Sequence, residues 1–215
     1  EPWELSEDFF TLFQNTRLMP HLHLPLQSGS DTVLRRMARR CKTEEFAAIV
    51  KKLRVQIPHF NVTTDIIVGF PGETEEEWQE SFGFIKQIGF GHIHIFTYSS
   101  REGTKAASLP NQLNNDVKKQ RSQQLHVLAN DMKLQFCRDN LGHEFPVLWE
   151  GYNEPLEGGK QKVFGYTPNY LKVSSLINND ESVENKTIST RLIAVEELSI
   201  FGKMLGSPLP LNSSG

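Results

Sequence analysis

The sequence predicts an α/β protein built on a parallel sheet or barrel, followed by a small all-β domain. In the first 143 residues, strand-like runs, polar turns and helix-like runs alternate, as in parallel βα units. From Phe145 the pattern changes to short β-like runs separated by glycine, proline and polar residues. No apolar run of eighteen residues occurs, so we expect no membrane-spanning helix and no membrane partner.

The composition is that of an ordinary globular protein. Of its 215 residues 38% are hydrophobic and 23% charged, and the net charge of -3 creates no field that would attract nucleic acid, so such a partner would need a local patch. The two cysteines, Cys41 and Cys137, are far apart and fit a reducing cytoplasm, where we expect the protein to be; we interpret both as structural thiols. Because the chain begins at Glu1 rather than methionine, we expect it to be a piece of a longer protein.

The first predicted unit contains a short helix up to Asn15, a strand over 21–26 and a turn of small polar residues at 27–30. Apolar residues at helical spacing then predict one helix around 31–42 and another from Thr43, which Pro58 stops.

The stretch 65–74, DIIVGFPGET, predicts a buried strand that turns into a helix. Thr74 and Glu77 have the spacing of a capping box, and Gly89 supplies the expected end of the helix. In parallel α/β proteins a turn of this kind lies at the carboxyl ends of the strands, where ligands bind. A plain βα turn without a ligand remains the alternative.

A third strand is expected at 92–98 and a long helix from Asp116 to Gly142. Four further β-like runs follow, at 145–149, 163–166, 170–176 and 188–195. We therefore divide the chain into a βα domain (1–143), a β domain (144–200) and a disordered tail (201–215) rich in proline, serine and glycine.

Four histidines alternate along two of the predicted strands: His21, His23, His92 and His94. Each pair could point into the barrel together and bind a metal ion. We favour hydrogen-bonded imidazoles and expect no metal site, because no third kind of ligand is placed beside them in the sequence.

Three phrases carry a resemblance to a known family: HLHLPLQSGS (21–30), DIIVGFPGET (65–74) and HIFTYSSREGT (94–104). Together they resemble the second half of the radical-SAM methylthiotransferases, the family that includes MiaB, RimO and MtaB. The third phrase and GYTPNY (165–170) are most similar to the MtaB branch, which modifies threonylcarbamoyladenosine in tRNA.

The resemblance implies that 1–143 are the later strands of a partial radical-SAM (β/α) barrel and that 144–200 are a TRAM-like β domain. It implies a parent enzyme that adds a methylthio group at C2 of N6-threonylcarbamoyladenosine next to the anticodon, using S-adenosylmethionine (SAM) and two 4Fe-4S clusters. The cysteine triplet CxxxCxxC that holds the radical-SAM cluster is absent. We therefore expect this chain to ligate no cluster, to hold no catalytic residue and to be inactive alone.

The resemblance also implies SAM contacts. Gln27, Arg39 and Asp65 match polar SAM-binding positions, and Arg39 could pair with a carboxylate; a solvated helix face shared with neighbouring arginines is the alternative for Arg39. Gly69 would let the backbone approach the adenine. The full set of expected cofactor-binding residues is Gln27, Ser28, Arg39, Asp65, Gly69, Phe70 and Pro71.

For the substrate we expect contacts from Glu73 and Arg101, with an intraprotein salt bridge as an equal alternative. In the β domain, Tyr166, Asn169, Tyr170 and Lys172 could stack on and bond an unpaired tRNA anticodon loop. Because acidic residues outnumber basic ones there, a domain that only packs against the barrel remains an alternative.

Two other functions stay open: a non-catalytic RNA-binding module, and a radical-SAM methylthiotransferase that acts on another tRNA base or on a ribosomal protein. The exposed strand edges of an incomplete barrel also predict self-association, unless the chain's own N-terminal helix closes the edge.

Overall fold

The computed structural model describes Leu5 and residues 7–207. The chain divides into two compact units, unit 1 from Glu1 to Lys133 and unit 2 from Leu134 to Gly215. Each unit is described by itself.

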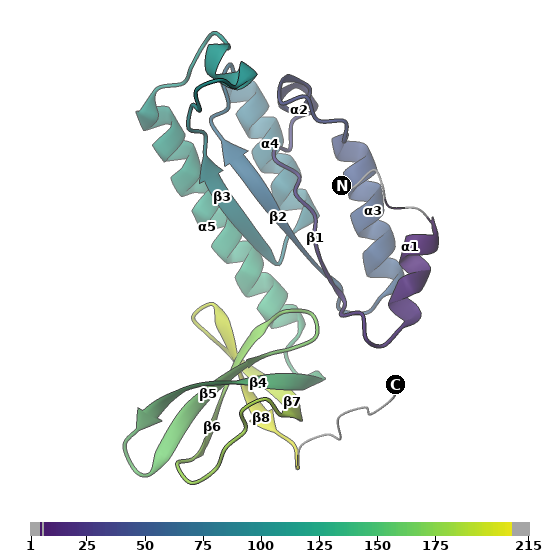
Figure 1. Ribbon diagram of the computed structural model, residues 1–215, viewed down its shortest axis with the longest axis vertical. Helices are drawn as coiled ribbons and strands as arrows, with labels where there is room; N and C mark the ends of the chain where they lie inside the picture. The colour runs from purple at the N-terminus through teal and green to yellow at the C-terminus, as the bar shows by residue number, and fades with distance from the viewer. Residues whose placement is uncertain (1–4, 6, 208–215) are drawn as a thin grey trace. The chain divides into compact units, whose positions relative to one another are not determined.

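Unit 1 is built on a three-stranded parallel sheet (Figure 1). Its strands are β1 (His21–His23), β2 (Asn61–Val68) and β3 (His92–Thr97), in the order β1-β2-β3. Beyond β1, Gln27 forms an isolated parallel bridge with Ile66. The predicted α/β architecture is therefore confirmed. The first strand, expected over 21–26, ends at His23, and the chain pairs with β2 again only at Gln27.

Helices cover one face of this sheet, and Figure 1 shows α4 and α5 running behind the strands. Alternate strand residues such as Val62, Ile66 and Ile93 pack in one apolar cluster with Trp78 and Leu125 of the helices. The helical segments of unit 1 are α1 (Glu7–Thr11), η2 (Leu12–Gln14), α2 (Asp31–Arg36), α3 (Thr43–Gln56), α4 (Glu75–Ile88), η3 (Lys105–Ser108) and the first part of α5 (Asn115–Asp139), whose residues from Leu134 belong to unit 2.

The other face of the sheet, which we call the open face, carries the strand residues of opposite parity. They are His21, His23, Asn61, Thr63, Asp65, Ile67, His92, His94 and Phe96. Most of these side chains are polar, and His23, His92, His94 and Phe96 are exposed. The strands therefore bury one face and expose a mainly polar one.

The start and end of α4 agree with the sequence prediction. The Thr74 side chain accepts a hydrogen bond from the Glu77 backbone while the Glu77 side chain accepts one from the Thr74 backbone, which completes the capping box. Gly89 ends the helix in the left-handed conformation, with φ of 65°. The turn before α4 is thus fixed by local chemistry.

Unit 2 contains a closed five-stranded barrel in the order β4-β5-β6-β8-β7. Inward-facing residues of the strands, among them Trp149, Val173 and Leu192, form its apolar core. The strands are β4 (Glu144–Leu156), β5 (Lys160–Tyr166), β6 (Lys172–Asn178), β7 (Thr187–Glu196) and β8 (Ser199–Met204).

Strand β8 corrects the expectation that the chain is disordered from residue 201. It lies between β6 and β7 and buries Ile200, so residues 201–204 belong to the barrel. Gly202 fits here because a Cβ at that position would lie 2.6 Å from Thr190 Cγ2 and 2.9 Å from Val173 Cγ1. The rest of the predicted tail from residue 208 lies outside the described residues.

Helix α5 is the longest described helix, but neither it nor any other helix in the described part of the chain is long and apolar enough to cross a bilayer.

Candidate functional site

The turn after β2 is held by α5. Gly69 adopts a φ of +75°, and its backbone N–H donates to Glu73 Oε2 at 3.0 Å. A Cβ on Gly69 would lie 2.6 Å from Lys118 Cγ. Glycine is therefore required at this position by backbone conformation and by packing against Lys118, and the adenine contact expected for it stays a prediction.

Glu73 and Arg121 form a buried ion pair behind this turn. Arg121 Nη1 lies 2.8 Å from Glu73 Oε2, and the two side chains are 6% and 1% exposed. The same guanidinium donates to the carbonyl of Thr74 at 3.3 Å and to Glu75 Oε2 at 3.0 Å. Burial raises the pKa of Glu73, and the charge of Arg121 opposes that rise.

The Glu73 carboxylate is thus enclosed within unit 1, where its Oε2 atom accepts from Gly69 and Arg121, and the substrate contact expected for it stays a prediction. The alternative, an intraprotein salt bridge, is what the structure shows. Arg101 lies exposed on the loop after β3, where its predicted substrate contact remains open.

The expected cofactor-binding residues around the turn are brought together, but most of their side chains face the interior. Gln27 donates its backbone N–H to the carbonyl of Asp65 at 2.8 Å and accepts from Ile67 at 2.9 Å. The whole Gln27 residue is 9% exposed, and Ser28, Phe70 and Pro71 are also buried. A ligand could therefore contact these four residues mainly through their backbone atoms.

Arg39 is half-buried and lies in the loop that follows α2, which ends at Arg36. The alternative of a solvated helix face is therefore wrong for Arg39, since Ala38 with φ of +57° has already left the helix. Its expected contact with the carboxylate of SAM remains a prediction.

Asp65 points from the open face, where its side chain is 25% exposed. The His23 Nε2 atom lies 3.3 Å from Asp65 Oδ1, and the rings of His23 and His94 are 5.6 Å apart. The ligand atoms of all three side chains lie within 4.8 Å of one another. A third kind of ligand therefore does stand beside the histidines, contrary to the premise on which a metal site was rejected.

The neighbouring imidazoles have the polar partners that the sequence analysis anticipated. His21 Nε2 and His23 Nδ1 each lie 3.1 Å from Thr63 Oγ1. Burial, aided by the charge of His23, lowers the pKa of His21. Burial also lowers the pKa of His92, whose ring packs against that of His94 at 4.7 Å.

The residues of this chain do not fit an iron–sulfur cluster. Its two cysteines, Cys41 and Cys137, are buried and lie in different units. A radical-SAM cluster needs three thiolates that converge on one site. That this chain ligates no cluster stays a prediction, based on the missing cysteine triplet.

In unit 2, neighbouring strands bring together aromatic rings and an ammonium group. The rings of Tyr166 and Tyr170 stack at 5.1 Å with 23° between their planes. Lys172 is the strand partner of Tyr166, and its ammonium lies 4.8 Å from the centre of the Phe164 ring. Tyr152 packs against Phe164 at 5.5 Å. We call these five residues the aromatic patch.

Tyr170 projects from the patch because its backbone is held in the left-handed conformation. Its φ is +66° and its side chain is 61% exposed. The turn that carries it is closed by hydrogen bonds from Thr167 to Asn169 (2.5 Å) and from Asn169 to Asn140 (3.1 Å). Burial, with the charge of Glu150, raises the pKa of the partly covered Tyr166 hydroxyl.

Asn169 itself is fully buried, so its side chain is enclosed and the RNA contact expected for it stays a prediction. Its amide braces the turn that presents Tyr170. The sequence does not single out Phe164 and Tyr152. Phe164 lies two residues before Tyr166 and Tyr152 two before Glu154, but only the register of the strands shows that the two aromatic rings are neighbours.

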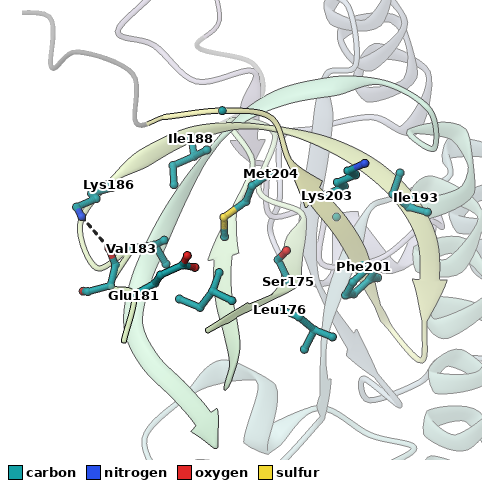
Figure 2. A pocket seen from close by; sticks show the side chains of 14 residues that line it. Ser175, Leu176, Glu181, Val183, Lys186, Ile188, Ile193, Phe201, Lys203 and Met204 are labelled. Carbon is teal, nitrogen blue, oxygen red and sulfur yellow. Dashed lines mark hydrogen bonds between the residues drawn. The ribbon is translucent and has the colours of Figure 1, made fainter. Parts of the chain in front are cut away.

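A pocket of about 600 Å³ opens elsewhere on the barrel (Figure 2). Val183, Ile188, Phe201 and Met204 give it an apolar lining, with the Glu181 carboxylate and the Lys203 ammonium nearby. None of the predicted site residues lines this pocket.

Comparison with known proteins places these features in a family. Residues 2–85 match the model of the radical SAM superfamily. The chain is 37% identical over 183 residues to threonylcarbamoyladenosine tRNA methylthiotransferase MtaB of Bacillus subtilis, covering 85% of this chain and 40% of that protein. It is 40% identical over 161 residues to tRNA-2-methylthio-N(6)-dimethylallyladenosine synthase of Caldicellulosiruptor saccharolyticus, covering 73% and 34%.

The fold of the chain also resembles that of a solved structure, coproporphyrinogen III oxidase (HemN) from Escherichia coli, a radical SAM enzyme. The TM-score is 0.52 at 18% identity, and the match covers 61% of this chain and 31% of HemN. The chain spans less than half the length of each of these relatives. Over most of its own length the chain is thus similar to radical-SAM methylthiotransferases.

Proposed function

We propose that this chain is part of a tRNA methylthiotransferase, in which unit 1 forms one wall of the SAM site and the barrel of unit 2 is a TRAM-like domain that binds the tRNA anticodon stem-loop. The proposed reaction adds a methylthio group at C2 of N6-threonylcarbamoyladenosine. Its place of action is the cytoplasm. The MtaB relative supports this nucleoside.

The observation that carries the RNA-binding role is the presentation of Tyr170. Its ring is exposed, stacked on Tyr166 and held outward by a buried hydrogen-bond network. A base that stacks on such a ring gains about 1–3 kcal/mol. The ammonium of Lys172, on the strand position paired with Tyr166, can meet a phosphate.

This local arrangement answers the objection that the barrel is rich in acidic residues. Two acidic residues border the aromatic patch, because Glu154 accepts from the Tyr152 hydroxyl at 3.3 Å and the charge of Glu150 acts on Tyr166, while the Lys172 ammonium lies over the Phe164 ring. Stacking depends on the ring faces and not on net charge, so a small platform can bind unpaired bases within an acidic domain.

In unit 1, the residue offered to SAM is Asp65, whose partly exposed carboxylate can accept hydrogen bonds from hydroxyl or ammonium groups. An iron–sulfur cluster for the radical chemistry would have to be held by residues of the parent outside this chain. Because this chain lacks a thiolate set for that cluster, we expect it to show no iron-dependent turnover of SAM by itself.

A relative with a different printed substrate supports one alternative within the same class. The dimethylallyladenosine enzyme is as similar to this chain as MtaB is, so methylthiolation of another adenosine derivative in tRNA is the second candidate. A ribosomal-protein substrate and a non-catalytic RNA-binding module remain the outlying alternatives.

The RNA-binding role can be tested by titrating a labelled anticodon stem-loop into the chain at low salt. We expect Tyr170→Ala and Lys172→Ala each to weaken binding about fivefold or more, and Lys172→Ala also to flatten the salt dependence. Lys203→Ala is the matched control, because it removes an exposed ammonium from a different strand of the same barrel. Stem-loops that carry threonylcarbamoyladenosine or dimethylallyladenosine would separate the two nucleosides.

Absence of binding at low salt would remove the RNA-binding role from both units. Equal losses in Lys203→Ala and Lys172→Ala would show attraction by charge alone. Turnover of SAM by the reconstituted chain would contradict the expected inactivity.

A further inference from the structure

We propose that His23, Asp65 and His94 form a binding site for a divalent transition-metal ion on the open face of unit 1. The three residues come one each from β1, β2 and β3. Their potential ligand atoms all lie within 4.8 Å of one another.

The sheet register places these side chains together. His23 pairs with Thr63, and Asp65, two residues further along β2, pairs directly with His94. Residues two apart on a strand share a face, so all three side chains point away from the helix-covered core. Three rigid strands thus carry one ligand each, which is a firmer support than a loop provides.

The geometry is close to that of a bound ion. Ligand atoms about 2.1 Å from a tetrahedral ion lie about 3.4 Å from each other. His23 Nε2 and Asp65 Oδ1 are already 3.3 Å apart. The His94 ring is exposed and can close the remaining gap by turning about χ2, which has a broad energy minimum in histidine.

A second hydrogen bond orients the His23 ring. Its Nδ1 atom faces Thr63 Oγ1 at 3.1 Å, which directs Nε2 toward Asp65. Histidines that ligate metals have their other ring nitrogen fixed in this way, and the partner sets the tautomer. Thr63 is in turn fixed because it is buried in β2.

The ligand set indicates which ions fit. Two imidazoles and one carboxylate suit zinc, iron(II), cobalt and related divalent ions, and are a poor match for calcium or magnesium, which prefer oxygen. Three protein ligands leave at least one coordination position open. Because His23 and His94 are exposed, that position faces solvent and can take water or a further ligand.

The same three side chains can also be explained as an ion pair beside a histidine, with no metal. The two explanations differ in one respect: an ion pair between His23 and Asp65 gives His94 no role in holding a cation. Binding of zinc that requires His94 as much as His23 therefore distinguishes them.

The test uses the metal-stripped 215-residue chain and zinc ions in competition with a chromophoric chelator. We expect one zinc ion per chain, and at least a tenfold loss of affinity in each of His23→Ala, Asp65→Asn and His94→Ala, since loss even of an outer-sphere partner costs about 10–100-fold. His21→Ala is the control from the same strand and face, and His126→Ala is an exposed control on α5; both should bind within about twofold of the parent chain. Circular dichroism checks that every variant is folded.

Cobalt(II) provides a second readout, because its visible spectrum reports the ligand type. We expect the spectrum of a nitrogen and oxygen site without a thiolate charge-transfer band, and its loss in Asp65→Asn. No saturable zinc binding, binding that survives all three substitutions, equal loss in His21→Ala, or a thiolate band from Cys41 or Cys137 would each overturn the proposal.

Discussion

Glu77 combines two roles at the start of α4. Its Oε2 atom accepts from the backbone of Thr74 at 3.0 Å, and both carboxylate oxygens accept from Arg36, at 2.9 and 2.5 Å. The hydrogen bond from Arg36 is the main reason that the pKa of Glu77 lies below its ordinary value of 4.5. This carboxylate therefore links a helix cap to a bidentate ion pair.

We predict that Glu77→Gln lowers the free energy of unfolding by about 1 kcal/mol at pH 7, because glutamine keeps the capping acceptor but loses the charge. A lowered pKa contributes stability above the unfolded value and loses it as the pH falls through the folded value. The difference between the two proteins should therefore shrink below pH 4.5. Urea denaturation across this range measures it.

The control for this prediction is Glu76→Gln, which removes a charge from an exposed position in the same helical turn. It should cost less and change less with pH. A difference between Glu77→Gln and the parent chain that grows in acid would refute the explanation.

At the residue scale, the sequence indicates which residues lie near the turns better than it indicates what their side chains contact. The sequence indicates Asp65 as a polar residue for a SAM contact, which stays a prediction, whereas its pairing with His94 follows only from a strand register across 29 residues. Asn169 and Glu73 were assigned to ligands because both are polar residues near loop ends. Their burial depends on Asn140 and Arg121, which no local pattern connects to them.

At the scale of elements, the turn between β2 and α4 is braced by α5. Arg121 reaches Glu73, the Thr74 carbonyl and Glu75 from one turn of α5, while Lys118 fills the space beside Gly69. The turn at the expected ligand side of the sheet is thus positioned by a helix more than forty residues later in the chain.

We predict that Arg121→Met destabilises unit 1 by about 3 kcal/mol, because it leaves the enclosed Glu73 carboxylate without its partner. The double substitution Glu73→Gln/Arg121→Met should lose clearly less, since no buried charge remains. Chemical denaturation followed by the helical circular dichroism signal gives both values. A double variant as unstable as the sum of the two single ones would show that the groups do not interact.

The elements with local signals were predicted well, and those defined by distant packing were not. The capping box at Thr74 and the left-handed Gly89 follow from residues within one helix. Strand β8 was missed because Gly202 weakens its strand character, and the reason for that glycine is its approach to Thr190 and Val173 on two other strands.

At the scale of the whole molecule, the two units differ in whether their sheets have free edges. In unit 1 the described sheet ends in β1 on one side and β3 on the other, whereas the strands of unit 2 close into a barrel. Closed barrels have no free edge, and open ones offer unpaired backbone groups. On the open face, Phe96 is also 53% exposed beside Ile67.

We predict that the chain self-associates through unit 1 as its concentration rises, because the edges and the apolar end of the open face can pair with a second copy. Sedimentation velocity measures this. Phe96→Lys should shift the equilibrium toward monomer, whereas Leu148→Lys, on the exposed surface of the barrel, should not. A parent chain that stays monomeric at high concentration would contradict the prediction.

The closure of the barrel by β8 has a consequence for how the protein is made. Strand β8 meets β6 in parallel at Val173 and Ser174 and meets β7 in antiparallel pairing, so it joins two strands that otherwise have free edges. During synthesis, β4 to β7 emerge from the ribosome before it. The barrel therefore cannot close, and β6 and β7 each keep a free edge that other nascent chains and chaperones can reach, until β8 (Ser199–Met204) has also emerged from the ribosome.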